Sequence, residues 1–462
     1  MSKWIVLAPL AGSVYWLFFP SPQPMPQLPV DEWWGPATLA TKKQDTSIRP
    51  FKIQFEETMI KDLRDRLKNH RKWTPPLEGI GFQYGFNTAQ LNSWVSYWAE
   101  KYDFKAREAA LNEYPQFKTN IQGLDIHFIR VKPEVGARVV PLLLLHGWPG
   151  SVREFYETIP LLTAESKDRD FVLELIIPSL PGYGFSDPAA RPGLGAPQMA
   201  IVFRNLMHRL GFKKFYVQGG DWGGLITSNM ATMFQDVIEG FHVNIGFVMT
   251  PQATVMSILA SVYPSLIVEK QYQDRMYPLT KKWAYLMEET GYMHIQATKP
   301  DTVGVALNDS PTALMVYILE KFSTWTNKEY KLLADGGLSK KFSKDQLIDN
   351  LMFYWVSNSI TTSMRLYSET FNSRTFEVCE FVTLSHQNIP TNVPAWVLQA
   401  KHELAYSPPL FLKMKYKNLV NASHLDDGGH FLAFEMPNEF SNDVLEAMTR
   451  FQEIRAQGKT EL

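Results

Sequence analysis

The sequence predicts an α/β fold, in which helices cover a mostly parallel sheet. Three apolar runs carry this prediction: ARVVPLLLLHG, FVLELIIPSLPG and FKKFYVQGG, at residues 137–147, 171–182 and 212–220. Each run ends in a turn that contains glycine or proline, as expected of strands buried on both faces. The stretch GAPQMAIVFRNLMHRLG, residues 195–211, has helical spacing and lies between the last two runs. Alternation of strand, helix and strand is typical of an α/β fold.

An apolar segment precedes this body. Residues 1–22 contain the uncharged run WIVLAPLAGSVYWLFF, from Trp4 to Phe19. As a helix it would be about 24 Å long, slightly shorter than a hydrocarbon core of about 30 Å. A cleaved signal peptide is the alternative, but prolines follow directly where a small-residue cleavage site would be expected. We therefore expect a membrane anchor, followed by an extended proline-rich spacer from Pro20 to Pro29.

The next part, residues 23–115, is predicted to be an N-terminal helical and meander unit. The segments Phe55–Trp73 and Asn87–Asp103 both place apolar residues on one helical face and polar residues on the other. Asn87 is a suitable residue to cap the start of the second helix.

The remaining chain divides into an α/β core and an insertion. Residues 116–245 form the first part of the core, because they contain the apolar runs and begin with the alternating stretch IQGLDIHFIRVKP. Residues 246–368 are helical and aromatic, and we expect them to form a helical cap. Residues 369–462 complete the core, because VPAWVLQAKHEL at residues 393–404 again shows a strand followed by a turn.

Composition excludes several classes of function. The net charge of −1 and the absence of a basic stripe argue against nucleic acid as the main partner. Cys379 is the single cysteine, so neither an intramolecular disulfide nor a cysteine-based metal site can form.

The motif GGDWGG, residues 219–224, follows the third apolar run directly. It fits neither of the glycine-rich patterns that bind nucleotide phosphates. Gly219 and Gly223 lie two residues either side of Asp221, which is the small-residue spacing of a nucleophile elbow. An ordinary glycine-rich turn with a capping aspartate is the alternative. The elbow interpretation makes Asp221 a candidate nucleophile.

The motif HGWPGS, residues 146–151, follows the first apolar run. A glycine-containing turn at the end of a strand can direct the backbone N–H of Trp148 into the cleft. Together with the N–H of Trp222, it would form a two-donor oxyanion hole.

Two further candidates come late in the chain. Glu403 ends the strand pattern in AKHELAYSP, and His430 follows two glycines in DDGGHFLAFE. The order Asp221, Glu403, His430 is nucleophile, acid, base, as in α/β-hydrolases. A zinc site of the H-E-x-x-H type does not fit, because Tyr406 occupies the position of its second histidine.

These motifs together resemble those of the microsomal epoxide hydrolase family, in particular its insect branch, the juvenile hormone epoxide hydrolases. The likeness covers nearly the whole chain and includes DEWWGP, HGWPGS, PSLPGYGFS, GGDWGG, GYMHIQATKPDTVG and DGGHFLAFE. It implies an α/β-hydrolase core with a helical cap. It also implies that Asp221 is the nucleophile, His430 the base and Glu403 the acid that orients it.

The resemblance adds two residues that sequence patterns alone do not distinguish among 19 tyrosines. Tyr292 in GYMHIQ and Tyr367 in MRLYSE match the cap tyrosines that bind and protonate the epoxide oxygen. The implied substrates are lipophilic epoxides, juvenile hormone or xenobiotic, and water, with no metal or organic cofactor. The implied location is the endoplasmic reticulum membrane, with a cytosolic catalytic body.

Two other functions share part of the pattern. A haloalkane dehalogenase also uses an aspartate nucleophile, followed by a tryptophan such as Trp222 that can bind halide. The paired tyrosines favour an epoxide, since a departing halide needs no proton. A carrier that binds lipophilic epoxides without converting them is the third hypothesis, and the complete acid–base set argues against it.

Overall fold

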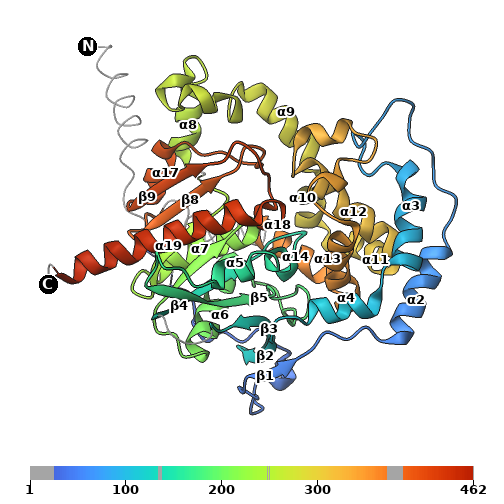
Figure 1. The fold of residues 1–462 in the computed structure, drawn as a ribbon, viewed down its shortest axis with the longest axis horizontal. Coiled ribbons are helices and arrows are strands. Elements are labelled where there is room, and N and C mark those ends of the chain that lie inside the picture. Colours follow the sequence, from blue (N-terminus) through green and yellow to red (C-terminus); the bar gives the residue numbers. More distant parts are fainter. Residues whose placement is uncertain are drawn as a thin grey trace, which may run out of the picture.

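A nine-stranded sheet forms the centre of the computed structural model (Figure 1). The structure describes residues 27–133, 138–246, 250–371 and 389–460, together with Met25 and Val248. The strands are β1 (Arg49–Phe51), β2 (Gln116–Ile121), β3 (Leu124–Val131), β4 (Arg138–Leu145), β5 (Phe171–Pro178), β6 (Phe215–Gly219), β7 (Ile238–Val243), β8 (Ala395–Gln399) and β9 (Leu419–His424).

The strand order is β1-β2-β3-β5-β4-β6-β7-β8-β9. The strands from β5 to β9 pair in parallel, whereas β1, β2 and β3 add to the edge in antiparallel fashion. Strands β4 and β6 are neighbours, and Leu145 at the end of β4 lies opposite Gly219 at the end of β6. The turns that follow these two strands therefore lie side by side, although more than 70 residues separate them in sequence.

Helices of the core flank this sheet. They are η4 (Val152–Phe155), α5 (Ile159–Thr163), α6 (Ala196–Arg209), α7 (Asp221–Met233), α17 (Pro409–Lys415), α18 (Leu432–Glu435) and α19 (Pro437–Thr460). Helix α6 packs on α7, and α19 packs on α5 and β7. In the view of Figure 1, α19 crosses in front of the sheet. The strand interiors, such as Leu142–Leu145, are completely buried, as the apolar runs predict.

The insertion between β7 and β8 is helical. It contains α8 (Pro251–Leu259), η5 (Pro264–Leu266), η6 (Lys270–Arg275), α9 (Leu279–Glu289), α10 (Gly291–Thr298), α11 (Pro300–Asp309), α12 (Pro311–Thr324), η7 (Lys328–Leu332), η8 (Leu338–Lys340), α13 (Lys344–Ser357) and α14 (Ile360–Phe371). Helices α10 to α14 lie together at one end of the sheet (Figure 1).

The N-terminal helices lie against this insertion. They are η1 (Ala37–Leu39), α2 (Glu57–Lys68), η2 (Thr88–Gln90), α3 (Leu91–Ser96), η3 (Tyr97–Lys101) and α4 (Phe104–Leu111). Helix α2 contacts α12, and α4 contacts α13. Asp349 of α13 is fully buried and forms ion pairs with Arg107 of α4 and Arg153 of η4. This network fixes η4, which follows the HGWPGS turn, against both helical regions.

The structure confirms most of the expected elements and corrects two points. Helix α2 falls inside the expected segment Phe55–Trp73, but the expected helix Asn87–Asp103 is three shorter pieces, which include one turn of π-helix. Asn87 caps the first of these pieces by accepting the backbone N–H of Ala89. Strands β1, β7 and β9 are not anticipated by the sequence patterns, because polar residues or proline interrupt them and they do not form continuous apolar runs.

The expected membrane anchor at residues 1–22 lies outside the described residues. Within the part of the chain that the structure describes, no helix has both the length and the apolar character needed to cross a bilayer.

Candidate active site

The turn between β6 and α7 has the sharp geometry that its glycine spacing predicts. Asp221 begins the helix with a φ of 50°, which is rare for a residue other than glycine. A Cβ added at Gly219 would lie 2.3 Å from the backbone of Gly223, and one at Gly223 would lie 2.1 Å from the carbonyl oxygen of Leu145. Real atoms cannot approach so closely, so both positions require glycine.

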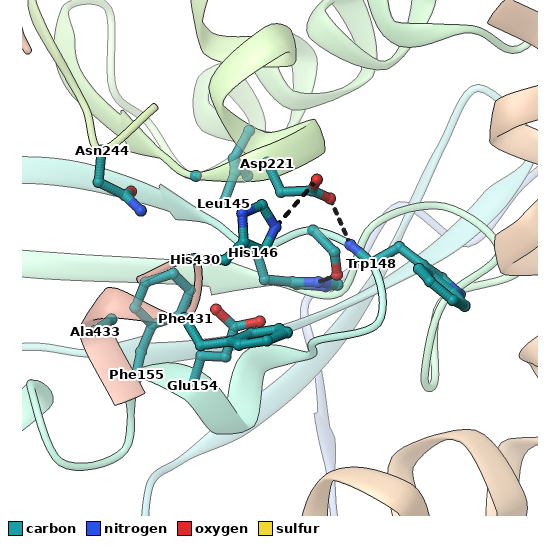
Figure 2. Close-up of a pocket in the computed structure, with 12 residues that line it drawn as sticks. Leu145, His146, Trp148, Glu154, Phe155, Asp221, Asn244, His430, Phe431 and Ala433 are labelled. Atoms are coloured by element: carbon teal, nitrogen blue, oxygen red, sulfur yellow. Dashed lines mark hydrogen bonds and ion pairs between the residues drawn. The ribbon is translucent and has the colours of Figure 1, made fainter. Parts of the chain in front are cut away.

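Three side chains that are far apart in sequence meet at this turn. His430 Nε2 lies 3.3 Å from Asp221 Oδ2 (Figure 2). On the other side of the ring, His430 Nδ1 lies 2.8 Å from Glu403 Oε1. His430 and Glu403 are both buried. The backbone N–H of Leu404 donates to the same Glu403 oxygen over 2.6 Å, and that of His430 donates to Trp325 O over 2.9 Å. The imidazole is therefore held between two carboxyl groups.

The two carboxyl groups determine the charge of His430. Burial alone would lower the pKa of the imidazole, but the nearby charges of Glu403 and Asp221 outweigh it and raise the pKa well above its usual value. While Asp221 is ionised, His430 is therefore protonated at neutral pH. Removing the charge of Asp221 would lower the pKa of His430 and favour its neutral form.

The HGWPGS turn contacts the other oxygen of Asp221. The backbone N–H of Trp148 donates to Asp221 Oδ1 over 2.7 Å (Figure 2). A Cβ on Gly147 would lie 2.1 Å from this oxygen, so the close approach depends on glycine. Trp222 is the second residue of α7, and its N–H has no carbonyl partner within the helix. Of the two amides expected to form an oxyanion hole, that of Trp148 comes from the turn after β4 and contacts Asp221 directly. That of Trp222 belongs to the residue that follows Asp221 in α7.

His146, the histidine of the same turn, has a structural role. His146 Nε2 accepts the backbone N–H of Leu180 over 3.2 Å. Burial lowers its pKa to about 4, so this imidazole is neutral at physiological pH. His146 therefore supports the turn and cannot act as a second cation there.

Tyr292 of α10 and Tyr367 of α14 reach the site from the helical insertion. Their ring centroids are 5.7 Å apart, and the Tyr292 ring stacks on Trp148 at 5.1 Å. The buried hydroxyl of Tyr367 lies near that of Tyr292 and makes no other hydrogen bond to the described residues. Burial and the charge of Asp221 raise the pKa of Tyr292, and burial with the neighbouring Tyr292 and Asp221 raises that of Tyr367. Both phenols are protonated at neutral pH.

An apolar cavity of about 150 Å³ lies beside Asp221 and the two tyrosines. Asp221, Tyr292 and Tyr367 contribute polar groups to its wall, together with Ser228 and Tyr416. The other lining side chains are mainly apolar and include Trp222, Leu225, Ile245, Met293 and Phe371. A carboxylate and two phenols at the wall of an apolar cavity suit a lipophilic substrate with one reactive oxygen.

Two carboxyl groups near the site, buried Glu435 and half-buried Glu154, are not distinguished by the sequence patterns. Glu435 accepts the backbone N–H groups of Gly429 and Phe431, each over 2.8 Å, and so fixes the loop that carries His430. Glu154 of η4 lines the same pocket as Asp221 and His430 (Figure 2). Burial raises the pKa of each carboxyl to about 8. Neither residue lies in a recognisable catalytic spacing, and only the folded structure shows that they are close to His430.

The residues described include no group of three or more His, Cys, Asp or Glu side chains arranged to hold a metal ion. His402, which precedes Glu403, lies 3.3 Å from the side-chain nitrogen of Asn327.

Two family models match this chain. A model of the epoxide hydrolase N terminus matches residues 48–155, and a model of the alpha/beta hydrolase fold matches residues 140–264.

Curated proteins from insects and a mammal are similar over nearly the full length. The chain is 59% identical to juvenile hormone epoxide hydrolase from Bombyx mori, covering 97% of this chain and 96% of that protein. It is 47% identical to juvenile hormone epoxide hydrolase 1 from Ctenocephalides felis, with coverage of 98% and 96%. It is 43% identical to epoxide hydrolase 1 from Sus scrofa, with coverage of 96% and 98%.

Solved structures show the same similarity in three dimensions. The crystal structure of juvenile hormone epoxide hydrolase from Bombyx mori superposes with a TM-score of 0.90 at 60% identity. The match covers 93% of this chain and 100% of that chain. The structure of Aspergillus niger epoxide hydrolase has a TM-score of 0.72 at 25% identity, with coverage of 88% and 97%.

Proposed function

This chain belongs to the epoxide hydrolase family, has the α/β-hydrolase fold and is an epoxide hydrolase, and we propose that it works through a covalent ester on Asp221. The observation that carries the proposal is the position of the Asp221 carboxylate. It faces the apolar cavity with Tyr292 and Tyr367, and its Oδ2 lies 3.3 Å from the imidazole of His430. One group therefore contacts both the substrate cavity and the base.

Aspartate suits the first step because an epoxide carbon is saturated and opens by backside displacement. The Asp221 carboxylate attacks without a base, and the resulting ester keeps a carbonyl carbon that water can attack. A serine nucleophile would leave a stable ether. The two amides of Trp148 and Trp222 would hold the oxyanion that forms when water attacks the ester.

Tyr292 and Tyr367 supply the proton that ring opening requires. The ring oxygen leaves as an alkoxide, which is far more basic than a phenolate, so a phenol within hydrogen-bond distance protonates it readily. The raised pKa values of both tyrosines ensure that they carry this proton at neutral pH. We assign the helices from α8 to α14 as the cap that presents the two phenols.

A double variant tests this assignment. In Tyr292→Phe/Tyr367→Phe we expect the rate of ester formation to fall about 10²- to 10⁴-fold, because positioned acid catalysis is lost. Each single variant should lose less, since the other phenol remains. The rate is measured by rapid quench and intact-protein mass with excess enzyme. An unchanged rate in the double variant would contradict the assignment of these residues.

The second step is hydrolysis of the ester by water that His430 activates. Ester formation removes the negative charge of Asp221, which otherwise raises the pKa of His430. The imidazole can then give up its proton, which replaces the one that the phenol gave to the alkoxide. The neutral ring can accept a proton from water, while Glu403 continues to orient it over 2.8 Å. The diol leaves and Asp221 recovers its carboxylate.

The preferred substrate is proposed to be juvenile hormone. Support comes from the similar insect proteins that bear this name and from the apolar lining of the 150 Å³ cavity. The alternative is that the chain is a general xenobiotic epoxide hydrolase. The similarity to the mammalian protein named epoxide hydrolase 1 supports this alternative.

Comparison of kcat/KM for juvenile hormone with values for styrene- and stilbene-type oxides separates these alternatives. We expect juvenile hormone to be preferred by at least about 10-fold, since each buried methylene of its chain contributes about 0.8 kcal/mol to binding. A clear preference for the aryl oxides would reject the hormone as the main substrate and leave the reaction chemistry intact.

We also propose that residues 1–22 anchor the enzyme in the endoplasmic reticulum membrane. The uncharged run Trp4–Phe19 supports this proposal, because its composition suits a hydrocarbon environment. Extraction of membranes that contain the full-length chain with alkaline carbonate tests it, and complete release would contradict it.

A further inference from the structure

A second, much smaller cavity lies beside Asp221. Its volume is about 10 Å³, which is room for about one water molecule. The ends of β4 and β6 and the loop of His430 enclose it. Its lining includes His146, Trp148, Glu154, Asn244 and His430.

Asp221 separates this small cavity from the substrate cavity. It is the one described residue that lines both, since the other residues around the 150 Å³ cavity belong to α7, to the cap helices, or are Ile245 and Tyr416. His430 lines only the small cavity, whereas Tyr292 and Tyr367 line only the large one. The groups that serve ring opening and the group that serves hydrolysis therefore lie on different sides of the same carboxylate.

Glu154 is the carboxyl side chain placed at the small cavity in addition to Asp221. It reaches the cavity through the space left by Gly150, where an added Cβ would lie 1.4 Å from Glu154 Oε1. One backbone N–H, that of Ser151, lies beside the Glu154 carboxyl, whereas the two oxygens of Glu435 each accept a backbone N–H. The remaining lone pairs of Glu154 are available to a molecule in the cavity.

We propose that the small cavity holds the hydrolytic water and that Glu154 is the residue that positions it. This inference rests on the proposed covalent mechanism. A water molecule that attacks the ester must point a lone pair at Asp221 Cγ and one hydrogen at His430 Nε2. Its second hydrogen then needs an acceptor, and a carboxyl oxygen of Glu154 provides it. With both hydrogens held, the lone pair has one orientation.

The atoms of this step balance without another reactant. The water oxygen bonds to Asp221 Cγ while one proton moves to His430 Nε2. The tetrahedral centre then collapses and breaks the bond between Cγ and the alkyl oxygen, which takes the proton from His430 and leaves as the diol. The second proton of the water stays on the Asp221 carboxyl group and then passes to the neutral His430, which restores the Asp221 carboxylate with one oxygen from water.

The electrostatics of Glu154 agree with a position beside this water. Burial raises its pKa to about 8, so the carboxyl is mainly protonated at neutral pH. Its carbonyl oxygen can then accept a hydrogen bond from the water without placing a second negative charge beside Asp221.

The test compares Glu154→Gln with Glu154→Met in the full-length enzyme. The amide of glutamine keeps a carbonyl acceptor, whereas methionine has a similar shape and lacks one. In single turnovers we expect Glu154→Met to form the ester at a rate within about 3-fold of wild type and to hydrolyse it about 10-fold more slowly or worse, the effect of one lost hydrogen bond to a reacting group. Glu154→Gln should hydrolyse the ester within about 3-fold of wild type. Glu165→Met, at an exposed glutamate after α5, is the matched control.

The outcomes are distinguishable. A wild-type rate of ester hydrolysis in Glu154→Met would overturn the inference. It would also be overturned if Glu154→Met and Glu154→Gln lost ester formation and ester hydrolysis to the same extent, because that result indicates a purely structural role for Glu154. Failure of the wild-type enzyme to form any ester would instead reject the covalent mechanism itself. If Glu154→Met does not fold, Glu154→Asp replaces it, because the shorter side chain retracts the carboxyl from the cavity and should slow hydrolysis selectively.

Discussion

Replacement of Asp221 by alanine is expected to lower turnover of epoxides by roughly 10⁴-fold or more, because it removes the atom that attacks the substrate. The fold should persist, since the side chain points into the cavities and the backbone turn depends on Gly219 and Gly223. Diol formation measured at saturating substrate, with circular dichroism as a check on folding, gives the result.

Asp168→Ala is the control for this variant, because Asp168 is exposed and remote from the site. It should retain wild-type activity. Substantial activity in Asp221→Ala would mean that water opens the epoxide directly, and the covalent mechanism would then be wrong.

The His430→Gln variant should divide the reaction into its two steps. Ester formation needs no base, so the variant should still attack the substrate, but hydrolysis should fall by about 10³-fold or more without an activated water. The ester therefore accumulates. Intact-protein mass spectrometry should show an increase equal to one substrate molecule, and peptide mapping should place it on Asp221.

A double variant provides the internal control for the adduct. Asp221→Ala/His430→Gln should show no mass increase, because it lacks the residue that forms the ester. Normal substrate binding by His430→Gln with no adduct would argue against a covalent intermediate.

The elements that the sequence predicts best are those with a strong local cause. The elbow is one example, because the backbones near Gly219 and Gly223 exclude a Cβ and only glycine satisfies this condition. The apolar runs are another, since a strand buried on both faces must be apolar throughout. The position of Trp148 beside Asp221 has a different cause, the parallel pairing of β4 with β6, and was expected because sites in α/β folds lie at the carboxyl ends of the strands.

Features that depend on packing between distant segments were not predictable. Strand β7, with the sequence IEGFHV, contains a glutamate and a histidine and shows no clear period. Glu154 and Glu435 look like ordinary charged residues of short helices until the fold buries them beside His430. The division of the site into two cavities at Asp221 is a property of the complete structure. Resemblance, rather than local pattern, identified Tyr292 and Tyr367.

A single turnover in water labelled with ¹⁸O tests the covalent ester most directly. With enzyme in excess over substrate, the first diol should contain only unlabelled oxygen, because its new oxygen comes from the Asp221 carboxylate. The label should instead appear in the peptide that contains Asp221, since water attacks its Cγ. Labelled oxygen in the first diol, with none in Asp221, would contradict the mechanism.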